Sequence, residues 1–112
     1  MSTRQARSTL AAAITNAVPA GTAVYPYDPP VITGNTITVS SAGPNGTEVR
    51  LYIRVYVPDV QSMEGQDTVD DLMDAVDSAA DAVPRSTWSA VYDQLKGVFL
   101  MQAIVDFPRE DF

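Results

Sequence analysis

The chain has 112 residues, of which 46% are hydrophobic and 19% charged, so its length and composition suit one folded domain rather than a disordered segment. It contains no histidine and no cysteine, which argues against an enzyme, because histidine most often transfers protons near neutral pH and cysteine supplies thiolate nucleophiles and zinc ligands. The formal net charge of −7 disfavours direct binding to DNA or RNA, since nucleic-acid-binding domains normally carry a basic surface.

The first half of the chain predicts one helix followed by three strands. Residues 2–18 place alanine, leucine and isoleucine at helical spacing. Residues 22–27 predict a short strand at a sheet edge or strand end, because Pro26 cannot donate a ladder hydrogen bond. Residues 36–40 alternate β-branched side chains and predict a second strand. A strong turn signal at residues 43–46 then joins this strand to the next as a hairpin.

Residues 48–57 form the clearest predicted strand, with an apolar row of side chains on one face and a second row on the other. The second row, called here the Arg/Tyr row, consists of Arg50, Tyr52, Arg54 and Tyr56. One interpretation is a sheet face that is exposed or covered by the first helix. The other is a surface between subunits, because Tyr and Arg are enriched at protein interfaces. Stacking of nucleic-acid bases on these tyrosines conflicts with the acidic charge.

Residues 68–83 predict a second helix whose apolar stripe could cover the long strand. Thr68 and Asp71 resemble a capping box, with Asp in place of the usual Glu. The opposite side of this helix carries an acidic stripe, which consists of Asp70, Asp74, Asp77 and Asp81. A solvated helix face and an electrostatic surface, which meets a basic neighbour or repels a phosphate, are both open. A calcium site fits poorly, because the spacing is helical and no central glycine is present.

The last part of the chain predicts two strands, at residues 87–94 and 98–107. The second of these is apolar on both faces, so we expect it to be central in the sheet and covered on both sides. Trp88 is expected to pack in the core or in an interface. These elements predict a single α+β domain over residues 1–112, ordered helix, three strands, helix, two strands. In it, two helices pack on a mainly antiparallel sheet of about four to five strands.

The layout of the whole chain resembles a known family. An alanine-rich helix precedes Val-Tyr-Pro-Tyr-Asp-Pro-Pro at residues 24–30, and a hairpin ends in Val-Arg-Leu-Tyr-Ile-Arg-Val-Tyr-Val-Pro at residues 49–58. A Thr-Val-Asp-Asp-Leu-Met-Asp-Ala-Val helix at residues 68–76 precedes Gly-Val-Phe-Leu-Met-Gln-Ala-Ile-Val-Asp-Phe at residues 97–107. This layout resembles the tail terminator (tail completion) proteins of long-tailed, siphovirus-type bacteriophages. The resemblance covers nearly all of the chain and rests on element order, length and texture, not on a short motif.

The resemblance implies a structural virion protein, not an enzyme, with no cofactor and no metal. It implies a homo-oligomeric, hexameric ring that caps the tail tube and joins the tail to the head. The partners would be the major tail tube protein and a head–tail connector or stopper protein. The location would be the head-proximal end of the tail, after assembly in the host cytoplasm. DNA would pass through the lumen without specific binding, and no membrane would be involved.

A ring needs two unlike patches that meet between neighbours. The Arg/Tyr row and the acidic stripe are the candidate subunit-interface residues on this interpretation. Two alternatives remain open: another connector or stopper protein of the phage neck, and a small acidic ligand-binding domain. No apolar run approaches the about 20 residues that a membrane-spanning helix needs.

Overall fold

The computed structural model describes residues 3–45, 48–58, 62–79, 87–94 and 98–108. Within these residues the chain forms two helices and five strands. They are, in chain order, α1 (Thr3–Ala17), β1 (Ala23–Tyr25), β2 (Thr36–Asn45), β3 (Glu48–Tyr56), α2 (Met63–Ala79), β4 (Ser89–Asp93) and β5 (Val98–Pro108). The α+β class predicted from the sequence is therefore confirmed.

All five strands belong to one mixed sheet, in the order β1-β2-β3-β5-β4. β1 runs parallel to β2, whereas the other three pairs are antiparallel. The short strand β1 lies at one edge, as its proline-containing sequence predicted, and β4 lies at the other edge. β5 lies between β3 and β4, so its predicted central position is also confirmed.

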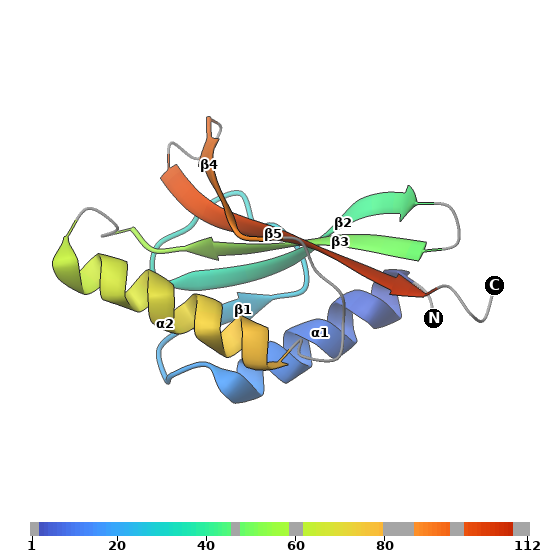
Figure 1. Ribbon diagram of the computed structural model, residues 1–112, viewed down its shortest axis with the longest axis horizontal. Helices are drawn as coiled ribbons and strands as arrows, with labels where there is room; N and C mark the ends of the chain where they lie inside the picture. Colours follow the sequence, from blue (N-terminus) through green and yellow to red (C-terminus); the bar gives the residue numbers. More distant parts are fainter. Residues whose placement is uncertain (1–2, 46–47, 59–61, 80–86, 95–97, 109–112) are drawn as a thin grey trace.

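Both helices pack on the same face of the sheet (Figure 1). The core lies between the two layers, and its members are Ala6, Leu10, Ala11 and Ile14 from α1, Val69, Leu72 and Val76 from α2, and Ile37, Val39, Leu51, Ile53, Val55, Val57 and Val105 from the sheet and the residue after β3. The apolar row predicted for the long strand is buried there throughout. The apolar stripe of α2 closes the core over β3 and α1, as its length and spacing suggested.

The other face of the sheet, called here the open face, carries no helix of the described chain (Figure 1). On β5, Leu100 is buried on this face beside Tyr56, while Gln102, Ile104 and Asp106 are only half-buried. The expectation that β5 is covered on both sides is therefore wrong beyond Leu100. The physical reason is that both helices bury their apolar stripes in a single core.

The helix α2 begins at Met63, earlier than the predicted start at Thr68. The Oγ atom of Ser62 accepts a hydrogen bond from the backbone N–H of Gly65 at 2.9 Å, which caps the first turn. Thr68 lies inside the helix, and its hydroxyl donates to the backbone oxygen of Glu64 at 2.9 Å. The predicted capping box is therefore wrong, and Gly65, which precedes the predicted helix, is buried within α2. The end of the predicted helix, beyond residue 79, lies outside the described residues.

The β2–β3 hairpin is longer than the turn signal at residues 43–46 suggested. β2 continues to Asn45 and β3 starts at Glu48, with a register shift between Ser41 and Gly43. A bulge of this kind lets an extra residue enter a strand without ending the pairing. β1 pairs only with Thr36, Ile37 and Thr38, so the proline of the hairpin has no described strand on its outer side. No helix in the described part of the chain is long and apolar enough to cross a membrane.

Candidate functional site

The Arg/Tyr row lies on the open face, because its residues alternate along β3 with side chains that are buried in the core. Tyr56 is 1% exposed and belongs to the protein interior. Arg50, Tyr52 and Arg54 are half-buried and retain some contact with solvent. The row is thus neither covered by α1 nor freely exposed, and it offers surface at three of its positions.

Arg54 is the centre of a polar cluster on this face. Its Nε atom donates to Oε1 of Gln102 at 2.8 Å, and its Nη1 atom lies 3.2 Å from Oδ2 of Asp28. Gln102 is also the residue paired with Arg54 across β3 and β5. The guanidinium lies 5.1 Å from the ring centroid of Tyr52, within the range of a cation–π contact. Three contacts from three directions hold this side chain in one orientation.

Asp28 connects this cluster to the segment between β1 and β2. Its Oδ1 atom accepts a hydrogen bond from the Tyr56 hydroxyl at 3.2 Å, while Oδ2 faces Arg54. The next residue, Pro29, is buried. The carboxylate therefore fixes the β1–β2 segment over one end of the open face. On β2, Thr38 lies opposite Arg54; it is 0% exposed and its Oγ1 atom has no hydrogen-bond partner.

Arg50 and Asp106 form a second ion pair on the same face. Nε lies 2.9 Å from Oδ1 and Nη2 lies 3.2 Å from Oδ2, so the two groups meet in a bidentate arrangement. The pair follows directly from strand pairing, because the two residues are opposite each other in β3 and β5. Their side chains are 37% and 27% exposed, so water and salt screen the attraction.

These ion pairs neutralise the positive charge of the Arg/Tyr row. Both of its arginines are paired with carboxylates of the same chain. The sequence alone did not identify Asp28, Gln102 or Asp106 as partners. The β3–β5 register could have indicated the last two, since cross-strand neighbours interact, but no local pattern connects Asp28 with Arg54.

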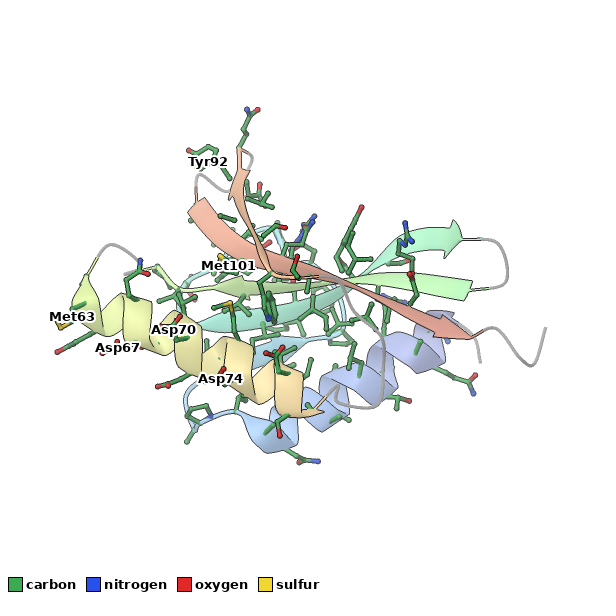
Figure 2. All side chains as sticks on the ribbon, viewed as in Figure 1. Met63, Asp67, Asp70, Asp74, Tyr92 and Met101 are labelled. Carbon is green, nitrogen blue, oxygen red and sulfur yellow. The ribbon has the colours of Figure 1, made fainter. Side chains whose placement is uncertain are left out.

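The acidic stripe lies on α2, in the helical layer. Asp70 and Asp74 are exposed, and Figure 2 shows them with Asp67 along the same helix. Glu64 and Asp71 are exposed as well, and α2 contains no lysine or arginine. Asp81, the last predicted member, lies outside the described residues. The exposed acids make the surface of α2 strongly negative, because the helix has no basic residue to neutralise them. Acids one turn apart on this helix repel each other.

Asp77 differs from the rest of the stripe. It is half-buried, and its Oδ1 atom accepts a hydrogen bond from the indole N–H of Trp88 at 3.1 Å. The Trp88 ring packs against the core, as one of the two sequence expectations for this residue stated. Asp77 therefore ties the segment before β4 to α2, which is a structural task inside one chain.

The structure does not bring the two candidate patches together within one chain. The Arg/Tyr row belongs to the open face of the sheet, whereas the acidic stripe belongs to the helices that cover the other face. Within the described residues, no group of three or more potential metal-ligating side chains is placed to hold a metal ion. Comparison with models of known protein families gave no match, and no curated protein matches the chain either.

Proposed function

We propose that this protein is a structural component of a bacteriophage tail, a tail terminator that forms a hexameric ring at the head-proximal end of the tail tube. The proposal starts from the whole-chain resemblance. The major tail tube protein would meet one side of the ring, and a connector or stopper protein of the neck would meet the other side.

The observation that supports this proposal best is the position of two unlike patches on opposite layers of the domain. A closed ring uses a heterologous contact, in which one patch of a subunit meets a different patch of its neighbour. The open face offers Tyr52 and the side chains of Arg50 and Arg54, which contacts within the chain hold in fixed orientations. The helix α2 offers a row of exposed carboxylates. Side chains that are already fixed lose little conformational entropy on binding, which favours a specific contact.

The in-chain ion pairs of Arg50 and Arg54 limit what charge can contribute to such a contact. A carboxylate from a neighbouring subunit would have to share a guanidinium group that is already paired with a carboxylate of its own chain. Tyr52 and the half-buried strand face around it would therefore supply the packing, while the charges set the orientation and the rate of association.

The net charge of the chain also suits a ring through which DNA passes. The net charge of −7 per chain is multiplied by the number of subunits, and phosphates are repelled by a surface of this sign. A lumen that repels DNA allows passage without specific binding.

Electron microscopy of the purified protein, alone and mixed with purified tail tubes, tests the proposal. Rings of one size, and rings attached to tube ends, are the expected result. Protein that forms no rings under either condition, and that is absent from the neck of intact virions, would refute it. Binding to the neck protein without any binding to tubes would instead indicate a stopper.

A further inference from the structure

The strand β4 is an edge strand of the sheet, and its only charged residue is Asp93. It has β5 on one side and no strand of the described chain on the other. Its members are Ser89, Ala90, Val91, Tyr92 and Asp93. Edge strands are normally blunted by lysine, proline or a bulge, because an unprotected edge pairs with other chains. β4 has no lysine and no proline, and its pairing with β5 is continuous over all five residues.

The opposite edge of the sheet is protected in several ways. β1 has only three residues and is followed directly by Pro26. Beyond β1, the outer edge of β2 is interrupted by the register shift between Ser41 and Gly43 and then by Pro44. Of the two sheet edges in the described chain, only the β4 edge is therefore suited to strand pairing. A second copy of the chain would offer the same single edge.

We propose that β4 pairs antiparallel with β4 of a second copy, in a register centred on Val91. The two sheets then join into one continuous sheet, related by a two-fold axis. This is the register that pairs all five residues of both strands, since any shift leaves at least two of them without an opposite residue.

The side chains of β4 are complementary to themselves in this register. Ala90 lies opposite Tyr92, so a small side chain leaves room for a ring that is 50% exposed in the single chain. Ser89 lies opposite Asp93, where a hydroxyl can donate to a carboxylate and the two carboxylates do not face each other. Val91 lies opposite Val91 of the second copy, which makes the centre of the contact apolar.

The centre of the contact also continues an existing apolar strip. Val91 is half-buried and is paired with Leu100 on β5, which is 4% exposed. Pairing of two β4 strands would place the two valines between two buried leucines on the open face. Burial of apolar area of this kind favours the pairing.

This contact is distinct from the one that a ring needs. A two-fold contact uses the same patch on both copies and closes with two of them, whereas a ring joins different patches. The inference therefore does not rest on the proposed function. Salt separates the two kinds of contact: each chain carries −7, so salt screens the repulsion between two β4-paired copies and strengthens the dimer. A ring contact between opposite charges would instead weaken as the salt concentration rises.

A single cysteine in this cysteine-free chain tests the pairing. Opposite residues in antiparallel strands have Cα atoms about 4.5–5.5 Å apart, within the about 4.4–6.8 Å range that a disulfide spans. Under mild oxidation, we expect Val91→Cys to form covalent dimers at least about tenfold faster than Thr9→Cys, an exposed position on α1, because proximity raises the effective concentration of the two thiols. Equal rates for the two variants would overturn the proposal.

Two further variants test the register. Ala90→Cys and Tyr92→Cys should each cross-link slowly alone and rapidly when mixed, because these positions lie opposite each other only across two copies. Rapid cross-linking of either variant alone, with no gain on mixing, contradicts the register. Rings in the microscope without cross-linking at Val91 would remove this inference alone, and cross-linked dimers without rings would remove the proposed function alone.

Discussion

The carboxylate of Asp28 and the guanidinium of Arg54 join a segment without regular structure to the middle of the sheet. Oδ2 and Nη1 lie 3.2 Å apart, and the two side chains are only 26% and 22% exposed. The other carboxylate oxygen accepts the hydroxyl of Tyr56. No helix of the described chain packs on this face, so the pair helps to hold the β1–β2 segment in place there.

We expect Asp28→Ala to destabilise the protein by about 1–3 kcal/mol, because it removes the carboxylate that accepts from the Tyr56 hydroxyl and that pairs with a half-buried guanidinium. Urea unfolding followed by circular dichroism measures this change. Asp74→Ala is the matched control, because that carboxylate is exposed and its loss should change stability by less than about 0.5 kcal/mol. Equal effects of the two substitutions would contradict the role assigned to Asp28.

The second ion pair should contribute less. Asp106→Asn is expected to cost less than about 1 kcal/mol, because both partners are partly exposed and screened. The cost should shrink further as salt concentration rises. Unfolding curves at low and high salt measure both effects. A loss as large as that of Asp28→Ala, and independent of salt, would show that the Arg50 pair is shielded from water.

The start of α2 can be tested through its cap. Ser62→Ala removes the side chain that accepts from Gly65 and should cost about 1 kcal/mol. Thr68→Ala should have little effect or stabilise slightly, because that residue is inside the helix and alanine has the higher helix propensity. Thermal or urea unfolding distinguishes the two. The reverse order would restore the helix start suggested by the sequence.

Leu51→Asp should abolish the folded state, because Leu51 is 0% exposed and the change buries a charge without a partner. Val31→Asp makes the same kind of change at a position that is 68% exposed, so we expect that variant to stay folded. Circular dichroism and the dispersion of NMR signals report the outcome. A folded Leu51→Asp protein would show that the two faces of β3 have been assigned in reverse.

The acidic stripe is tested by the double variant Asp70→Lys/Asp74→Lys. The monomer should stay folded, with stability unchanged or higher by a few tenths of a kcal/mol, because the change relieves repulsion along α2. Ring formation should weaken if the stripe meets a neighbour, and native mass spectrometry would detect the loss. An unchanged oligomer would exclude the stripe from the subunit contact. Charge reversal at Arg54 is a poorer probe, because it would also place a carboxylate beside Asp28.

The periodicity of apolar residues along the chain was sufficient to predict that these helices and strands exist and which face of β3 is buried. Alternation of Leu51, Ile53 and Val55 with polar residues determines which side of β3 is buried, and the apolar stripe of α2 determines which side packs. These are local properties, because a strand or a helix repeats its faces at a fixed spacing. The class of the fold followed from them.

Partners far apart in the sequence were decided only by the tertiary structure. The helix stripes show that each helix has an apolar side, but not that both helices choose the same face of the sheet and leave the other open. No spacing rule relates Asp28 to Arg54, because their contact depends on the path of the β1–β2 segment across that open face. The sequence alone therefore revealed a basic, aromatic row and an acidic helix, and the folded chain showed that the arginines of that row are already paired with its own carboxylates.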